Sequence, residues 1–454
     1  MAEFDVIVIG AGPAGEVCAG RLGENDVSVA VVEHHLVGGE CSYYACMPSK
    51  ALLRPAEALD EARRIPGAAE AARGELAVDA VLKRRDQVIH DLDDSVQVPW
   101  LEDRGVTLLR GGARLTGERT IDVDGTEHTA RKAIVLATGT GALVPPIPGL
   151  ADAHAWTNRL GTTSSAVPER LLILGGGVVG VELGQAWASL GAQVSIVEGG
   201  PRLISREEEL ASRYVQDALA ARGVDIHVGS RAVGVERNGV VKLTLDNGDV
   251  LEGDEILVGV GRKPTTTDLG LETVGLEPSR YVEVDEQLRV PGSDWLYAIG
   301  DVNGRVLLTH MGKYQGRVAA DVILGRDARI DPRSDGPLSP RVIFTEPQVA
   351  AVGHTLASAQ DAKLEVRAVD FETSGTAGGS FYGRNAPGTS RLVVDEQRRV
   401  LVGATFCGVD VGEWLHAATI AIVGQVPIDT LWHAVPCFPT RSEVWLRLFE
   451  TYGL

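Results

Sequence analysis

Two glycine-rich loops constrain the fold of this chain more than any other feature. The first loop is Gly10-Ala11-Gly12-Pro13-Ala14-Gly15, and it follows an apolar run, Phe4 to Ile9, that is typical of a buried parallel strand. A helical stretch through Leu22 comes next, and a second apolar run, Val27 to Val32, ends at Glu33. In such a βαβ unit, Gly10, Gly12 and Gly15 let the backbone approach a pyrophosphate at the helix N-terminus, and Glu33 bonds a ribose hydroxyl. The segment therefore predicts a dinucleotide site.

The same arrangement occurs a second time. A strand over Leu171–Leu174 precedes the loop 175–180, whose glycines are Gly175, Gly177 and Gly180, and the next strand, Val194–Val197, leads to Glu198. One such loop is weak evidence and is compatible with an ordinary glycine-rich turn, but two complete units are strong evidence for two dinucleotides. Glu198 favours NAD over NADP because a carboxylate repels a 2′-phosphate, although the nearby Arg202 weakens this preference.

A close cysteine pair lies shortly after the first loop, in Cys41-Ser42-Tyr43-Tyr44-Ala45-Cys46. Such a pair is either a redox couple or half of a metal site, and a metal site needs a second Cys/His pair at ligand spacing. The other cysteines are scattered singly, so we predict a redox couple and no metal. If Cys46 begins a helix, the helix N-terminus favours its thiolate. With two dinucleotide sites, the natural cofactors are FAD and a nicotinamide.

Composition narrows the class of protein further. At 454 residues the chain exceeds one compact domain, and its net charge of −19 argues against nucleic acid or an anionic membrane surface as partner. Five cysteines do not make a disulfide scaffold in a chain of this length. No apolar run approaches the roughly 18 residues of a membrane span, and the acidic N-terminus lacks the charge of a signal peptide. We therefore expect a cytoplasmic protein.

Further motifs follow in a fixed order. They are Ala137-Thr138-Gly139, Glu182 two residues after Gly180, Gly261-Arg262-Lys263-Pro264, Tyr297 to Asp301, Leu308-Thr309-His310 and Phe344-Thr345-Glu346-Pro347. With the cysteine pair and Met47-Pro48-Ser49-Lys50, they make the chain resemble the class I flavoprotein disulfide reductases, the group of lipoamide dehydrogenase, glutathione reductase and mercuric reductase. The resemblance runs from Phe4 to about Leu448.

The resemblance implies an α/β fold with two Rossmann-like domains and a C-terminal α+β interface domain that builds a homodimer. Clusters of Pro and Gly near 144–149, 261–264 and 331–337 place the boundaries: an FAD-binding domain over 1–150 and 265–335, an NAD(P)-binding domain over 151–264, and the interface domain over 336–454. We expect strands over 341–353 and 391–406, a helix over 413–423 and another that begins near Thr440.

The resemblance also implies roles for individual residues. Cys46 is similar to the flavin-facing thiol and Cys41 to the interchange thiol that attacks substrate, while Lys50 and Glu182 match an ion pair beside the flavin and the nicotinamide. Asp301 matches the carboxylate on the ribityl chain of FAD. The remaining cofactor positions are Ala113, Thr138, Gly139, Gly261, Gly300, Leu308, Thr309 and His310.

One position departs from the family pattern. The family ends with His-Pro-Thr-x-x-Glu, in which the histidine protonates the interchange thiol, whereas this chain reads Phe438-Pro439-Thr440-Arg441-Ser442-Glu443. Phenylalanine cannot carry a proton. The sequence leaves open whether Glu443, His433, Tyr43, Tyr44 or solvent takes over. Cys437 is either an extra thiol or, as we prefer, a small buried residue.

These observations predict an enzyme, a pyridine nucleotide-disulfide oxidoreductase. Electrons pass from NAD(P)H through FAD to the Cys41–Cys46 disulfide and on to a small disulfide. Because the histidine is missing, reduction of a quinone or a metal ion is an alternative. A non-catalytic flavin-binding subunit is a second alternative, against which the intact cysteine pair, Lys50 and Glu182 argue.

Overall fold

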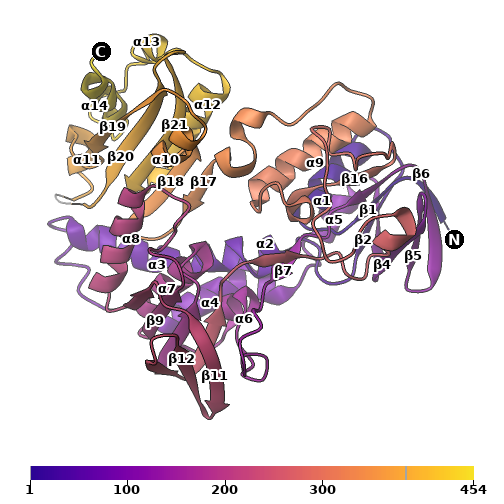
Figure 1. Cartoon of the computed structure of the whole chain (residues 1–454), viewed down its shortest axis with the longest axis horizontal. Coiled ribbons are helices and arrows are strands. Elements are labelled where there is room, and N and C mark those ends of the chain that lie inside the picture. Colours follow the sequence, from indigo (N-terminus) through magenta and orange to yellow (C-terminus); the bar gives the residue numbers. More distant parts are fainter. Residues whose placement is uncertain (1, 384–385) are drawn as a thin grey trace. The chain divides into compact units, whose positions relative to one another are not determined.

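A computed structural model describes residues 2–383 and 386–454 of the chain (Figure 1). Its contacts divide it into two compact units, each assembled from three separate segments. The first unit contains Met1–Pro48, Asp86–Leu143 and Gly261–Gly336. The second contains Ser49–Arg85, Val144–Val260 and Pro337–Leu454.

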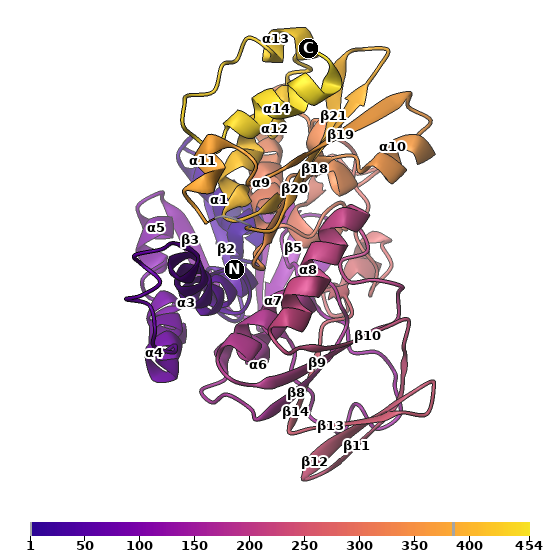
Figure 2. The ribbon, with the colours of Figure 1, turned by 90° about the vertical axis from the view of Figure 1, so that its left-hand side faces the viewer.

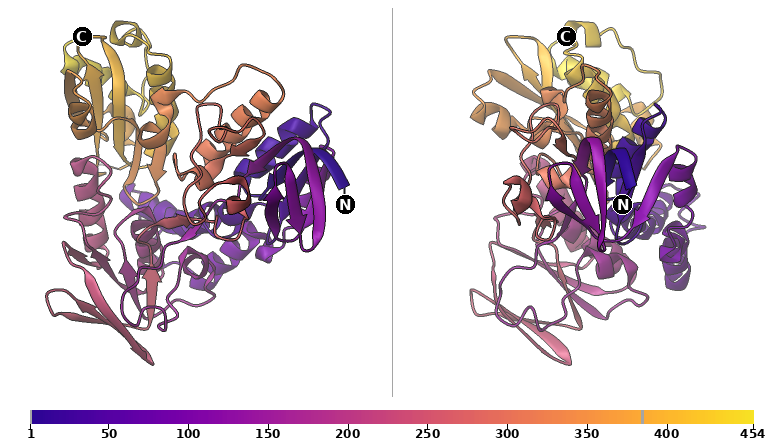
Figure 3. Two further views of the ribbon diagram at one scale, coloured as in Figure 1. Left: turned by 45° about the vertical axis from the view of Figure 1, so that its right-hand side comes forward. Right: turned by 90° about the vertical axis from the view of Figure 1, so that its right-hand side faces the viewer.

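The first unit is built on the sheet that starts at the N-terminus (Figure 3). Its strand order is β3-β2-β1-β6-β5-β4, and β16 pairs with β6. Strands β1, β2, β3, β6 and β16 are parallel, as expected where helices cover a buried sheet. The bounds are β1 Ala2–Ile9, β2 Val29–Glu33, β3 Val106–Arg110, β4 Ala113–Gly117, β5 Thr120–Val123, β6 Thr126–Leu136 and β16 Leu296–Ala298.

Helices and short elements complete this unit. Helix α1 packs against α9, and their apolar faces share one core with the sheet. A separate ribbon pairs β7 with β15. The bounds are α1 Pro13–Gly23, α2 Gly39–Tyr43, α5 Val98–Glu102, β7 Thr140–Ala142, β15 Arg262–Pro264, α9 Thr309–Ile323, and the 3-10 turns η1 His90–Leu92, η2 Leu271–Val274, η3 Gly300–Asn303 and η4 Pro332–Ser334.

The second unit contains another parallel sheet, with strand order β10-β9-β8-β14. A three-stranded antiparallel sheet, β11-β12-β13, belongs to the same unit. The bounds are α6 Asn158–Thr163, β8 Arg170–Leu174, α7 Val178–Ser189, β9 Gln193–Glu198, α8 Glu209–Ala221, β10 Asp225–Val228, β11 Ala232–Asn238, β12 Val240–Leu245, β13 Val250–Gly253 and β14 Glu255–Val258.

The C-terminal part of the second unit is a five-stranded antiparallel sheet with the order β17-β18-β21-β20-β19. Helices α12 and α14 pack against this sheet (Figure 2). The bounds are β17 Arg341–Ile343, β18 Gln348–Gly353, α10 Leu356–Asp361, β19 Val366–Glu372, α11 Ala377–Ser380, β20 Thr389–Asp395, β21 Val400–Gly408, η6 Val411–Trp414, α12 Leu415–Val423, α13 Ile428–Leu431 and α14 Glu443–Tyr452, with η5 at Gly336–Leu338.

The predicted fold class is confirmed, and so is a helix start at Cys46, the first residue of α3 Cys46–Arg64. The expected helix near Thr440 begins at Glu443, because Thr440 forms a turn by donating its hydroxyl to the Cys437 carbonyl at 2.6 Å. In the part of the chain that the structure describes, no helix is both long and apolar enough to cross a bilayer.

The assignment of residues 49–85 differs between the compact units and the predicted domains. The prediction placed these residues in the FAD-binding domain. In the structure they belong to the second unit. The reason is hydrophobic: Leu52 and Leu53 of α3, and Val81 and Leu82 of α4 Val78–Val88, are buried in the core that contains Trp187.

Candidate dinucleotide and dithiol site

The glycines of the first loop have different structural tasks. Gly10 has φ +106°, and a Cβ there would lie 2.4 Å from the carbonyl oxygen of Ala137. A Cβ on Gly15 would lie 2.0 Å from the Gly10 carbonyl oxygen, so both positions are closed to a side chain. A Cβ on Gly12 would have no atom within 4 Å. The open space at Gly12, at the N-terminus of α1, suits the close approach of a pyrophosphate.

The second loop repeats this division. Gly175 has φ +104° and a Cβ there would lie 2.6 Å from the Gly259 carbonyl oxygen, while one on Gly180 would lie 1.9 Å from the Gly175 carbonyl oxygen. Gly177 is open. Both loops therefore fit a dinucleotide phosphate, each within its own unit.

The acids that end the two strands are fixed by backbone donors. Glu33 accepts hydrogen bonds from the amides of Ala11, at 2.8 Å, and His35, at 2.7 Å. Glu198 accepts from the amides of Gly176 and Gly200, both at 2.6 Å. A carboxylate has about four acceptor positions, so each retains capacity for a ribose hydroxyl.

Asp301 is held at the start of η3 by two neighbours. Its Oδ2 accepts a hydrogen bond from the Thr140 hydroxyl at 2.7 Å, and Arg262 Nε donates to the same hydroxyl at 2.6 Å. Burial raises the pKa of Asp301, while the Thr140 hydrogen bond and the Arg262 charge oppose that rise. The sequence analysis missed Thr140, which directly follows the Ala137-Thr138-Gly139 motif.

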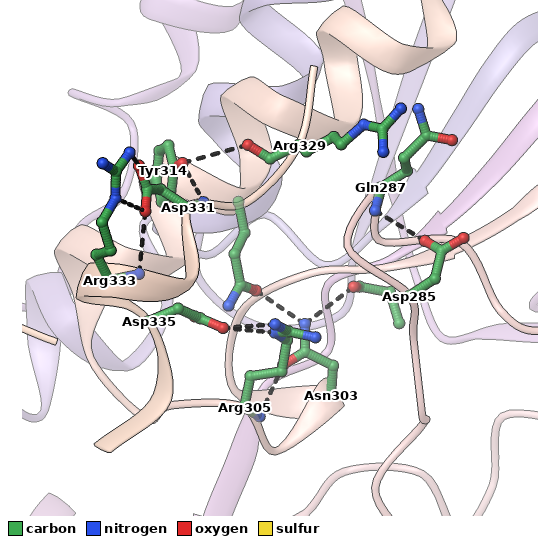
Figure 4. Close-up of polar contacts among 11 residues, drawn as sticks. Asp285, Gln287, Asn303, Arg305, Tyr314, Arg329, Asp331, Arg333 and Asp335 are labelled. Carbon is green, nitrogen blue, oxygen red and sulfur yellow. Dashed lines mark hydrogen bonds and ion pairs between the residues drawn. The ribbon is translucent and has the colours of Figure 1, made fainter. Parts of the chain in front are cut away.

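A buried polar network fixes the loop that carries Asp301. Gln315 Oε1 accepts from the Gly300 amide at 2.7 Å and from Asn303 Nδ2 at 2.8 Å. Arg305 donates through its amide to Asn303 and through its guanidinium to Asp335, with Nε 2.9 Å from Oδ2 (Figure 4). No motif in the sequence pointed to these residues, since their contribution depends on tertiary contacts.

The two cysteines that we predict to form a redox couple lie in consecutive helices. Cys41 is in α2 and Cys46 begins α3, and the two side chains share a hydrogen bond. Thr309 Oγ1 lies 3.2 Å from Cys46 Sγ. The pKa of Cys41 is raised by the hydrogen bond to Cys46, then by burial and by the Cys46 charge, and Thr309 and Lys313 oppose the rise. A raised pKa at Cys41 favours the proton on Cys41, and the N-terminus of α3 favours a thiolate at Cys46.

Lys50 and Glu182 form an ion pair in the second unit. Lys50 Nζ lies 2.6 Å from Glu182 Oε2, and the other oxygen of this carboxylate accepts from the Phe344 amide at 2.9 Å. Lys50 Nζ also lies 4.6 Å from the centroid of the Phe344 ring. The Glu182 side chain is 4% exposed, so the pair is a fixed, largely buried group rather than a loose surface contact.

Both tyrosines of the redox loop are occupied in packing. Tyr43 is fully buried beside Leu36, Ile89 and Leu92, and burial raises its pKa to about 12. The hydroxyl of Tyr44 lies 3.0 Å from His35 Nε2, and the two rings are stacked. A buried phenol with so high a pKa is poorly matched to proton transfer near neutral pH, which argues against Tyr43 as the relay.

The segment that departs from the family pattern is exposed. Phe438 is 76% exposed, and Cys437 is exposed as well, so our preferred interpretation of Cys437 as a small buried residue is wrong. The Cys437 carbonyl, rather than its thiol, accepts a hydrogen bond from the Thr440 hydroxyl at 2.6 Å. Glu443 is buried, and its carboxylate accepts from the Gly378 amide at 3.1 Å. His433 is exposed.

The other predicted cofactor positions lie in the first unit. Thr138 donates its hydroxyl to the Thr265 carbonyl at 2.8 Å, and the Gly139 carbonyl accepts from the Thr265 amide at 3.0 Å. The Gly261 carbonyl accepts from the Leu143 amide at 2.9 Å. Ala113 begins β4, Leu308 precedes the first turn of α9, and His310 is exposed within that turn.

Comparison with known proteins identifies the class that this fold and site define. A model of the pyridine nucleotide-disulphide oxidoreductase family matches residues 4–316, and a model of the dimerisation domain of the same family matches residues 339–448. The chain belongs to this family. It is an NAD(P)H-dependent oxidoreductase and an FAD-binding flavoenzyme, and the dimerisation domain indicates a homodimer.

Individual relatives cover nearly the whole chain. A dihydrolipoyl dehydrogenase of Thermus scotoductus is 33% identical over 99% of this chain and 97% of its own length. A mercuric reductase of Staphylococcus aureus is 29% identical over 97% of this chain and 81% of its own length. Among solved structures, the HOCl-induced flavoprotein disulfide reductase RclA of Escherichia coli, in its Cu(II) complex, matches with a TM-score of 0.87 at 24% identity over 99% of both chains. At that identity the match supports the fold alone.

Proposed function

We propose that this chain carries electrons from NADH through FAD to the Cys41–Cys46 disulfide and on to a small disulfide substrate. The observation that carries this proposal is the thiol pair itself: Cys41 hydrogen-bonds to Cys46 where α3 begins, and Thr309 contacts Cys46. The glycine loops and the carboxylates Glu33 and Asp301 fit FAD, which when bound supplies two-electron transfer between the nicotinamide and the disulfide.

The chemistry of the cysteine pair follows from which sulfur keeps the proton. After losing its proton, Cys41 attacks one sulfur of the substrate disulfide and forms a mixed disulfide, and the other substrate sulfur leaves as a thiolate that takes up a proton. Cys46 then attacks Cys41 Sγ, which releases the second substrate thiol and forms the Cys41–Cys46 disulfide. Two electrons have then passed from the cysteine pair to the substrate.

Two further groups support the nicotinamide step. The Lys50–Glu182 pair is held by the Phe344 amide and ring, so the carboxylate presents a fixed charge. At the second dinucleotide loop, Glu198 places a negative charge where NADP carries its 2′-phosphate, which favours NAD. The nearby Arg202 guanidinium donates to the carbonyls of Ser205 and Glu207 at 2.7 and 2.9 Å, which orients it toward its own loop.

A second candidate function rests on Phe438. Where the family places a proton-carrying histidine, this chain has an exposed phenylalanine, which favours an oxidant that needs no such donor, such as a quinone or a metal ion. In residues 2–383 and 386–454 no cluster of three potential metal ligands occurs, and this candidate function treats the metal ion as a substrate.

One experiment separates the two functions. The holoenzyme is reduced anaerobically with NADH, and its thiols are counted before and after; we expect a gain of two thiols, at Cys41 and Cys46. Cys41→Ser is then compared with the unmodified protein on a panel of disulfides and quinones. Loss of disulfide reduction with retained quinone reduction supports the proposal, whereas a protein that never gains thiols, or reduces only quinones, contradicts it.

A further inference from the structure

Helix α9 carries a cation one turn beyond the hydroxyl that contacts the redox thiols. Thr309 is the first residue of α9 and Lys313 follows four residues later, so their side chains lie on the same face of the helix. Lys313 is exposed, and its positive charge favours ionisation of Cys41. The helix thus brings a hydroxyl to the thiol pair and an ammonium within electrostatic range of Cys41.

The position of α9 is fixed by close packing on α1. A Cβ on Gly316 would lie 2.6 Å from the Ala14 carbonyl oxygen, and one on Gly312 would lie 3.3 Å from the Ala14 Cβ. Gln315, from the same helix, bonds the Gly300 amide in the buried network described above. Helix α9 therefore cannot shift relative to α1 and the Gly300 loop without breaking these contacts, and the backbone of Lys313 is held with it.

Cys41 has to lose its proton before it attacks a disulfide, and position 438 carries no group that could take that proton. The hydrogen bond with Cys46 raises the pKa of Cys41, the sulfur that has to attack the substrate. A nearby cation lowers the cost of removing that proton. The side chain at position 438 is a phenylalanine and carries no charge.

We propose that Lys313 supplies, from within the same subunit, the positive charge that activates Cys41 for attack on a disulfide. This inference rests on the proposed function, because it concerns the same thiol. The ammonium of Lys313 stabilises the Cys41 thiolate, which forms the bond to the substrate sulfur, and the substrate thiolate that leaves takes its proton from water. No electron passes through Lys313.

Glu16 is the counter-charge that modulates this effect. It lies in the first turn of α1, and Lys313 opposes the rise in its pKa. Burial, together with the charge of Glu33, raises the pKa of Glu16 to about 7, and Tyr43 of α2 also lies within range of its charge. Below that pH Glu16 is neutral and Lys313 acts alone; above it, the Glu16 carboxylate offsets part of the positive charge.

The test measures the reactivity of Cys41 rather than turnover. The holoenzyme is reduced with NADH and treated with the neutral reagent iodoacetamide, and modification of the Cys41 peptide is followed by mass spectrometry. At pH 7 and low salt we expect K313M to slow this modification about two- to fivefold, the size typical of one exposed charge, and K313R to restore it. The matched control is R317M, which removes an exposed cation one turn further along the same helix and should have a smaller effect.

Salt and pH separate an electrostatic role from a structural one. Raising the ionic strength to about 1 M shortens the Debye length to about 3 Å and should remove most of the K313M effect. In E16Q, Cys41 should be modified at the same rate as in the unmodified protein at pH 5.5 and faster at pH 8.5. The control E24Q removes an exposed carboxylate at the end of α1 and should change the Cys41 rate at neither pH.

Three results would overturn the inference: equal rates for K313M and the unmodified protein, equal effects of K313M and R317M, or an effect that persists at high salt. If E16Q changes the Cys41 modification rate equally at both pH values, Glu16 does not offset the charge of Lys313 in the way proposed. If NADH produces no reactive Cys41 at all, the proposed function itself fails, so the two failures can be told apart.

Discussion

Glu346 offers a quantitative test of how burial controls a carboxyl group in this protein. It is 4% exposed, and its pKa is raised from the ordinary 4.5 to about 7 because burial disfavours the charged form, an effect that the Arg64 charge only partly offsets. Arg64 Nη1 lies 3.0 Å from Oε1, but without the angle of a hydrogen bond. Among the described residues neither carboxylate oxygen has a hydrogen-bond donor.

We expect Glu346→Gln to stabilise the protein in a pH-dependent way. In the unmodified protein the unfolded chain ionises near pH 4.5 and the folded chain only near pH 7, so stability falls as the pH rises through this window. One pKa unit corresponds to about 1.4 kcal/mol, so the full loss is about 3 kcal/mol at pH 8. Glutamine does not titrate, so in the variant the contribution of position 346 to the unfolding free energy does not change with pH. The attraction to Arg64 acts only on the ionised carboxylate and is already included in the pKa of about 7, so it is not a separate contribution.

The assay is urea unfolding of the holoenzyme from pH 4.5 to pH 8.5, followed by tryptophan fluorescence. The quantity that matters is the difference in unfolding free energy between the variant and the unmodified protein, which should rise by about 2 to 3 kcal/mol across the window. Glu236→Gln, an exposed position on β11, is the matched control and should give a constant difference. A Glu346→Gln difference that does not change with pH would refute the assignment of a buried, neutral carboxyl.

Three further outcomes can be checked directly. Gly12→Ala should fold normally but retain less FAD, by absorbance after gel filtration, whereas Gly15→Ala should lower stability by about 1 to 3 kcal/mol or more because its Cβ would meet a carbonyl oxygen. The unmodified protein should have a higher kcat/KM for NADH than for NADPH, and Glu198→Ala should narrow that ratio; a preference for NADPH would contradict the assignment. Phe438→His should raise disulfide turnover, by up to about 10²-fold if the new imidazole reaches the thiol, and fast turnover of lipoamide by the unmodified protein would show that the missing histidine is not limiting.

The sequence could predict those parts of the site that depend on local chain geometry. The first glycine of each loop has positive φ and the last glycine meets a backbone carbonyl, so the spacing of the motif identifies them. The strands and helices around the loops were predicted close to their actual ends. The helix start at Cys46 was predicted for the same local reason. The motif around Lys50 and Glu182 predicted a pair, and the structure shows the contact at 2.6 Å.

The sequence could not predict the groups that act across elements distant in the chain. Gln315 supports the Asp301 loop from α9, and Phe344 fixes Glu182 through its backbone amide, a contact that no side-chain motif encodes. Likewise, the raised pKa of Glu16 arises from burial between elements that are far apart in sequence. These contributions depend on tertiary packing, and they become visible only when the fold is known.

The loop around Phe438 explains how chemistry can change here without a change of fold. Its conformation is held by other groups: the Thr440 hydroxyl bonds the Cys437 carbonyl, Glu443 accepts from the Gly378 amide, and Arg441 stacks 4.0 Å from the ring of Tyr382. Within a single subunit Phe438 is 76% exposed and buries little surface. The residue at this position can therefore be exchanged at small cost in stability while the surrounding framework is kept. It follows that Phe438→His should melt within about 2 °C of the unmodified protein, as surface substitutions usually do, so a change in its turnover would report on proton transfer rather than on folding.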